Sequence, residues 1–266
     1  MARYSRRQLL TLATAGTGWS LARLRQCVAG ARWRDRRTFG PFHCSAGFPL
    51  APLSGLFDEV AEIDRELQRT LGLPPVSTPV DVYLLADERS HRALLEQIYP
   101  RVPYRRALYI QRGRQGAVFA FRHPDLATDL RHECTHALLH ANLPMVPLWL
   151  DEGLAEYYEP PATHRAFHHP HFASLRWNLR LGRLRTVRSL EQERELKDMG
   201  AVDYRSAWAW VHFMLHGPAT AHAELVRFLA DVRRGDPPGQ LSDRLHSAVP
   251  DLDRRVFQHF KHWRRV

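Results

Sequence analysis

Lysine is almost absent from this sequence of 266 residues. Of its 38 basic residues, only Lys197 and Lys261 are lysine and the others are arginine, a bias that resembles codon usage more than a binding surface. Residues 1–31 contain five arginines and no acid, so half of the formal net charge of +10 lies there. Elsewhere basic and acidic residues alternate, as in EQERELKD at 191–198, and form no single stripe. The composition argues against a nucleic-acid-binding protein.

Cysteines and long apolar runs are also scarce. Three cysteines, Cys27, Cys44 and Cys134, are too few for a disulfide framework. Cys44 and Cys134 could pair in an oxidising compartment, but we favour buried free thiols. Beyond the N-terminus no stretch approaches the ~20 apolar residues of a membrane-spanning helix, so we expect no stable span there.

The N-terminal residues 1–31 have the pattern of an export signal. SRRQLL at 5–10 resembles the twin-arginine motif. A modest apolar run from Leu9 to Ala22 follows, and Ala29-Gly30-Ala31 is a small-x-small cleavage pattern. Arg23 and Arg25 interrupt the pattern, so a disordered basic leader or an uncleaved anchor is the alternative. We favour export to the periplasm or cell envelope over a cytoplasmic location.

Apolar spacing predicts an α+β fold in one domain, residues 32–266, with an α/β lobe at 32–158 and a helical lobe at 159–266. Strands are expected at 36–50 and 79–86, with a hairpin at 105–121. Helices are expected at 53–72, 87–100, from about 123 to 140, at 148–159, 203–217, 221–235 and 251–266. Residues 160–203 read as irregular and polar, including a polar loop, HRAFHHPHF, at 164–172.

The stretch DLRHECTHALLH, residues 129–140, contains the motif H-E-x-x-H from His132 to His136. On a helix, positions i and i+4 lie one above the other, so both imidazoles can bind one metal ion. Glu133 can reach the same space and take a proton from metal-bound water. Cys134 lies about 200° around the helix from His132, so we expect it to pack in the core.

A catalytic zinc usually has three protein ligands. His140 lies about two helical turns from His132, too far to share an ion with it. The zinc family with a third histidine after a glycine is excluded, because Leu139 and Asn142 occupy those positions. Glu152 in PLWLDEGLAEYYE remains the candidate, provided that its helix folds back against the first.

The segment RHECTHALLH…LPMVPLWLDEGLAEYYE resembles the gluzincin metallopeptidases, and in particular the bacterial peptidase-MA-like domains of unknown function. The specific motif covers residues 131–158. The resemblance implies zinc bound by His132, His136 and Glu152, with Glu133 as general base. The spacing from His136 to Glu152 is shorter than in the aminopeptidases, and their substrate signature is not evident, so it does not imply aminopeptidase specificity.

The resemblance also implies supporting residues. Glu156 occupies the position of a carboxylate that orients a ligand histidine, and Asp151 could do the same; ordinary solvated helix charge is the alternative for both. An oxyanion donor is expected after the third ligand. We prefer Tyr204 over His212, although either could be a packing residue, and we expect Tyr157 and Tyr158 to pack.

The strand GAVFAF at 116–121 resembles the edge strand on which gluzincins bind an extended peptide. The sequence therefore predicts a zinc-dependent metallopeptidase that acts on a peptide or protein substrate. The alternative is an inactive peptide-binding protein on a peptidase fold, stabilised by zinc. A structural site would not need Glu133, which favours the enzyme.

Overall fold

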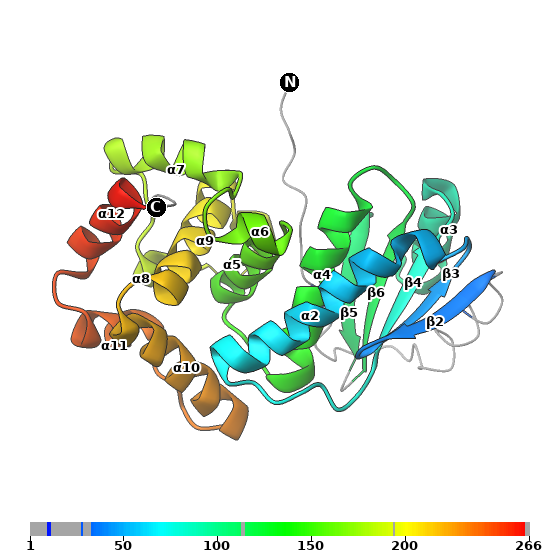
Figure 1. The fold of residues 1–266 in the computed structure, drawn as a ribbon, viewed down its shortest axis with the longest axis horizontal. Coiled ribbons are helices and arrows are strands. Elements are labelled where there is room, and N and C mark those ends of the chain that lie inside the picture. Colours follow the sequence, from blue (N-terminus) through cyan, green and yellow to red (C-terminus); the bar gives the residue numbers. More distant parts are fainter. Residues whose placement is uncertain (1–9, 12–27, 29–32, 113–114, 194, 264–266) are drawn as a thin grey trace. The chain divides into compact units, whose positions relative to one another are not determined.

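The computed structural model describes residues 10–11, 28, 33–112, 115–193 and 195–263 (Figure 1). Apart from Leu10–Thr11 and Val28, the predicted export signal lies outside these residues. The described chain forms two compact units. The sheet unit comprises residues up to 64 together with 76–141, and the helical unit comprises 65–75 together with 142–263.

The sheet unit is built on one mixed sheet with the strand order β1-β5-β6-β4-β3-β2. β4 pairs in parallel with β3 and β6, whereas β5 is antiparallel to β6 and β2 is antiparallel to β3. A two-residue strand, β1, pairs in parallel with β5. The strands are β1 (Leu10–Thr11), β2 (Asp35–Phe39), β3 (Phe42–Ala46), β4 (Val80–Leu85), β5 (Ala107–Arg112) and β6 (Gln115–Phe121).

The segment 36–50, predicted as one strand, instead folds into the β2–β3 hairpin. Gly40 makes the turn at a φ of +52°, a backbone conformation that favours glycine. A Cβ added at Gly40 would lie 2.9 Å from the Cβ of Ala61. The close approach of the neighbouring helix therefore adds a second reason for glycine at this position.

Three helices accompany the sheet: α2 (Ser54–Leu71), α3 (Glu88–Ile98) and α4 (Leu126–Asn142). Leu94, Leu95 and Ile98 of α3 share a buried cluster with alternate residues of the strands, including Leu108 and Phe119. Because side chains alternate along a strand, the intervening residues face the other side of the sheet. There the ring of Tyr109 stacks on His140 of α4, so the two helices cover opposite faces.

The helical unit has α5 and α9 at its centre, with α7 and α10 packed against α9. The main helices are α5 (Leu148–Tyr158), α7 (His171–Arg180), α9 (Ala201–His216), α10 (Ala219–Arg234), α11 (Leu241–Ala248) and α12 (Leu252–His262). Three short turns, α6 (Ala162–Arg165), α8 (Val187–Leu190) and η2 (Leu196–Asp198), connect them.

The prediction that residues 160–203 are irregular is wrong, because they contain α7 and three short helical turns. Leu175 of α7 and Val187 of α8 are buried, so each segment contributes to the core through a few apolar residues. Such short amphipathic segments contain too few repeats of the apolar spacing to be recognised as helices in a sequence. Helix α11 was not predicted for the same reason.

The fold is α+β, as predicted, with the sheet at the N-terminal side and a mostly helical C-terminal part. Cys44 and Cys134 are both buried and unpaired, which confirms the expectation of free thiols. Among the helices of the described residues, none is both long and apolar enough to cross a membrane.

Candidate metal centre

Helix α4 carries the H-E-x-x-H motif in a buried position. Every residue from Asp129 to His140 is buried, so the helix lies within the core and is not a surface helix. Its polar residues are paired near the N-terminal end, where the guanidinium of Arg106 donates to both carboxylate oxygens of Asp129 at 2.6 and 2.8 Å. Arg131 donates to Glu59 at 3.1 Å. The motif is thus held in a rigid setting.

The rings of His132 and His136 meet on one side of α4. Their Nε2 atoms lie 3.0 Å apart, and the planes of the two rings are nearly perpendicular at 82°. Two nitrogens bound to one tetrahedral zinc, each at about 2.0–2.1 Å, would lie roughly 3.3 Å apart. The spacing of the two imidazoles therefore fits a shared zinc ion.

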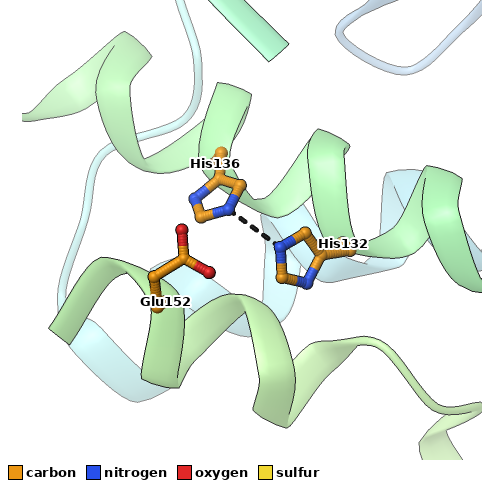
Figure 2. Close-up of side chains that lie close together, drawn as sticks. All are labelled: His132, His136 and Glu152. Carbon is orange, nitrogen blue, oxygen red and sulfur yellow. Dashed lines mark hydrogen bonds between the residues drawn. The ribbon is translucent and has the colours of Figure 1, made fainter. Parts of the chain in front are cut away.

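Glu152 of α5 completes the group. One ligand atom from each of His132, His136 and Glu152 lies within 4.8 Å of the other two. Figure 2 shows the carboxylate and both rings directed toward one another. All three residues are buried, Glu152 completely. A carboxylate is costly to bury without a compensating cation, and two imidazoles with one carboxylate form a known zinc-binding set.

The position of Glu152 depends on the close packing of its neighbour, Gly153. A Cβ added at Gly153 would lie 2.7 Å from the carbonyl oxygen of Ala207 and 2.9 Å from a methyl carbon of Val211, both on α9. Only glycine lets the two helix backbones approach so closely. Gly153 thus lets α5 pack closely against α9, and this packing fixes the position of the adjacent Glu152.

Glu133 is not part of the group of His132, His136 and Glu152. Its carboxylate accepts a hydrogen bond from the backbone N–H of Tyr109 at 2.8 Å. Tyr109 belongs to β5, so the sheet itself orients this side chain. The bond was not predicted, because no pattern in the sequence shows that a strand will donate to a residue 24 positions later.

Two further residues of α4, Cys134 and His140, are buried, as the sequence predicts for Cys134. His140 is not part of the ligand group, and its ring stacks on Tyr109 with the centroids 5.9 Å apart. Cys134 is fully buried, and burial raises the pKa of its thiol well above the ordinary value. Neither side chain is placed to add a fourth protein ligand.

The carboxylates of Asp151 and Glu156 are both buried, so neither is an ordinary solvated helix charge. Glu156 lies 2.9 Å from Nε2 of His171, and its backbone carbonyl accepts from the ring of His169 at 2.9 Å. His169 also stacks on Trp208, with the centroids 4.4 Å apart. The segment predicted as a polar loop therefore packs on α5 and α9, which corrects that expectation.

Tyr204 and His212, the candidates for an oxyanion donor, both lie on α9. His212 is buried, with Nδ1 3.0 Å from His259 and Nε2 3.0 Å from the carbonyl oxygen of Ala166. Both of its nitrogens are thus engaged within the core, and desolvation lowers its pKa well below the ordinary value. Tyr204 is buried one turn before Ala207, on the face of α9 that meets α5.

The tyrosines that end α5 pack as expected. Tyr157 is hydrogen bonded to His216 at 2.8 Å, and Tyr158 lies 3.5 Å from the hydroxyl of Thr70. Burial raises the pKa of Tyr158 to about 12. These contacts anchor the C-terminal end of the helix that carries Glu152.

The strand GAVFAF is not an edge strand. It forms most of β6, which pairs with β5 on one side and with β4 on the other. Its backbone N–H and C=O groups are therefore used within the sheet, and an extended peptide cannot pair with it. The sequence pattern predicts the strand but does not predict which strands pair with it.

Comparison with protein-family models finds no match, and comparison with curated proteins finds none either. The family resemblance seen in the motif therefore stays a prediction.

Proposed function

We propose that this protein is a zinc-dependent metallopeptidase of the gluzincin type. The observation that supports it best is the buried group of His132, His136 and Glu152, whose ligand atoms lie within 4.8 Å of one another. The two imidazoles are spaced for a shared ion, and a glutamate stands next to the first of them. Zinc with three protein ligands has a position left for water or substrate, which is the pattern of catalytic zinc sites.

When bound, zinc would supply Lewis-acid polarisation of the scissile carbonyl and of water. Glu133 would take a proton from the attacking water, whose oxygen bonds to the carbonyl carbon. As the C–N bond breaks, Glu133 would return that proton to the leaving amine nitrogen. The hydrogen bond from the N–H of Tyr109 holds the carboxylate of Glu133 in one orientation for this work.

Tyr204 is our candidate for the donor that stabilises the developing oxyanion. It lies on the face of α9 that packs against α5 at Gly153. His212 is the weaker candidate, because both of its nitrogens already lie 3.0 Å from other polar atoms. Replacing Tyr204 by phenylalanine should lower kcat by a factor of ten or more while leaving zinc content unchanged.

The main experiment compares metal content and hydrolysis in purified variants. Glu133→Gln should keep zinc and lose chelator-sensitive hydrolysis of an unfolded protein substrate, because an amide cannot accept the proton. His136→Ala should lose both. The control is His168→Ala, which removes an exposed histidine outside the ligand group and should keep both zinc and activity.

Each outcome has a definite meaning. Wild-type rates in the Glu133→Gln protein would overturn the proposed mechanism. Zinc in the wild-type protein without any turnover would favour the alternative, a peptide-binding protein stabilised by zinc. Zinc retained in His136→Ala would show that the ion is held elsewhere.

We also propose that residues 1–31 direct export by the twin-arginine route, on the basis of the motif SRRQLL and the weak apolar run that follows it. The protein would then act on peptides or proteins in the periplasm or cell envelope. A reporter fused to residues 1–40 should be exported, and replacement of Arg6 and Arg7 by lysine should abolish its export. A reporter that stays in the cytoplasm would end this proposal.

A further inference from the structure

Helix α7 presents an exposed apolar pair on the surface of the helical unit. Trp177 is 63% exposed and Leu181 is 57% exposed, more than any other large hydrophobic residue among those described. Leu181 is the C-cap residue that follows α7, and its backbone N–H donates to the carbonyl of Trp177 at 3.1 Å, so the two residues still have the i, i+4 spacing that shares one face of a helix. On the inner side Leu175 is fully buried. The helix is therefore anchored by one face, while Trp177 and Leu181 lie exposed on the other; Figure 1 shows where α7 lies in the chain.

The same segment carries an unusual concentration of positive charge. Residues 160–190 contain six arginines and no aspartate or glutamate. Three of these arginines pair with acids elsewhere in the unit: Arg165 with Glu66, Arg185 with Asp203, and Arg188 with Asp243. The remaining three, Arg176, Arg180 and Arg183, leave this segment with a net positive charge.

Arg176, Arg180 and Arg183 are all exposed, and none forms an ion pair with a described residue. The guanidinium of Arg180 lies 5.5 Å from the centroid of the Trp177 ring. The exposed tryptophan and leucine are thus flanked by three cations on one short stretch of chain. We call these five residues the α7 patch.

This combination is typical of a helix that binds at a membrane surface. Tryptophan prefers the level of the lipid headgroups, where its ring has an apolar body and a polar N–H. Leucine enters the acyl region beneath, while arginines bind the phosphates of anionic lipids. With ten residues, α7 is about 15 Å long, too short to cross a bilayer and suited to lie on it.

A nucleic acid would also attract arginines, and its bases can stack on tryptophan. Leu181 distinguishes the two partners, because an exposed leucine one turn from the tryptophan gains nothing from a phosphate backbone and gains burial in lipid. We propose that the α7 patch binds the surface of an anionic phospholipid membrane. This inference is independent of the zinc site.

The test measures binding of the full chain to phosphatidylcholine vesicles with and without phosphatidylglycerol. The wild-type protein should sediment with the anionic vesicles, and higher salt should weaken the binding. Arg176→Gln, Arg180→Gln and Arg183→Gln together should weaken it on the order of a hundredfold, about fivefold for each arginine. Trp177→Ser with Leu181→Ser should weaken it by about tenfold or more.

The control makes the same change of charge on α10, where Arg227, Arg233 and Arg234 are exposed on a helix with no large exposed hydrophobic residue. Unlike the α7 arginines, Arg227 and Arg234 pair with Glu224 and Asp231. Replacement of all three α10 arginines by glutamine should change binding less than threefold. The basic residues 1–31 are present in every variant, so any vesicle binding by that segment is a constant background. The exposed positions should leave the melting temperature unchanged, which checks that the variants fold.

Fluorescence gives a second readout at the patch itself. The emission of Trp177, taken as the difference between wild type and Trp177→Phe, should shift to shorter wavelength when anionic vesicles are added. Equal loss of binding in the α7 and α10 charge variants would overturn the proposal, as would binding unaffected by Trp177→Ser with Leu181→Ser. Retention of short duplex DNA that depends on the three α7 arginines, with no preference for anionic vesicles, would assign the patch to nucleic acid instead.

Discussion

The backbone N–H of Tyr109 donates to the carboxylate of Glu133 at 2.8 Å. The strand β5 thereby orients the residue that we assign as the general base. The ring of the same tyrosine stacks on His140, two helical turns beyond His132. One residue of the sheet thus contacts the motif helix twice, through its backbone and through its side chain.

Replacing Glu133 should separate its structural role from its chemical one. Glu133→Ala would leave the N–H of Tyr109 without this acceptor, so we expect a loss of about 1–3 kcal/mol in the free energy of unfolding. Glu133→Gln keeps an amide oxygen that can accept the same bond, so its stability should stay close to that of the wild type. Urea unfolding of both variants without metal measures the difference. Equal stability of the two would show that the bond with Tyr109 contributes little.

Gly153 should tolerate no side chain. A Cβ there meets the backbone oxygen of Ala207 at 2.7 Å, and backbone cannot move aside as a flexible side chain can. We expect Gly153→Ala to destabilise the protein by roughly 1–3 kcal/mol or more and to weaken zinc binding, since Glu152 is adjacent. Gly55→Ala is the matched control, because a Cβ added at this helical glycine would meet no atom within 4 Å. It should be neutral or stabilising by up to about 1 kcal/mol.

The long helices of this fold could be predicted from the sequence because each has a strong pattern of its own. The range 53–72, expected from regular apolar spacing ending at Gly72, corresponds to α2 at Ser54–Leu71. The hairpin at 105–121 corresponds to β5 and β6. Features that depend on a distant part of the chain could not be predicted in this way. The turn at Gly40 lies against Ala61 of α2, and β6 lies between β5 and β4.

The same difference holds for the residues of the candidate metal centre: those in a local pattern could be predicted, and those that depend on a distant part of the chain could not. The spacing of His132 and His136 on one helix is a local property, so the sequence alone places their rings together. Glu152 was a candidate only on the condition that its helix folds back against the first, because a turn between two helices is not visible in residue spacing. The packing of His169 and His171 on α5 was missed altogether, since isolated histidines beside Pro170 give the same pattern in a loop or in a core.

Three neighbouring histidines of the helical unit, His212, His216 and His259, should make its stability depend on pH. Desolvation lowers the pKa of His216 and of His259 to about 4 and also lowers the pKa of His212 well below its ordinary value. In the unfolded chain these groups titrate near 6.5. Between pH 6.5 and 4 the unfolded state therefore binds more protons, and the free energy of unfolding falls as the pH falls. Above pH 6.5 the full stability is present.

Melting temperatures from pH 7.5 to 5 check this dependence. His216→Gln with His259→Gln should flatten the curve in this range, because glutamine takes up no proton. His262→Gln is the matched control, since His262 is on the same helix as His259 but is exposed, and its curve should follow the wild type. An unchanged slope in the double variant would contradict the role of these histidines.

The two described cysteines should be unreactive in the folded protein. Burial raises the pKa of both the Cys44 and Cys134 thiols, and the thiolate is the reactive form. The measurement uses a Cys27→Ser background and no reductant. A thiol reagent should detect neither cysteine in the folded protein and should detect both cysteines after unfolding. Detection of neither after unfolding would show a disulfide between them.

Glu152→Gln should have opposite effects with and without zinc. The side chain of Glu152 is completely buried, and a buried carboxylate without a metal ion is costly, whereas the amide of glutamine has the same shape and no charge. Under chelation we therefore expect the variant to melt at or above the temperature of the wild type. With excess zinc the wild type should melt higher, because ligand binding stabilises the folded state by RT ln(1 + [L]/Kd) and loss of the carboxylate raises Kd. Thermal melts at several zinc concentrations would show the crossover. A parallel response of both proteins to zinc would mean that the carboxylate does not bind the ion, and the three-ligand site on which the enzyme proposal rests would be reduced to the two histidines.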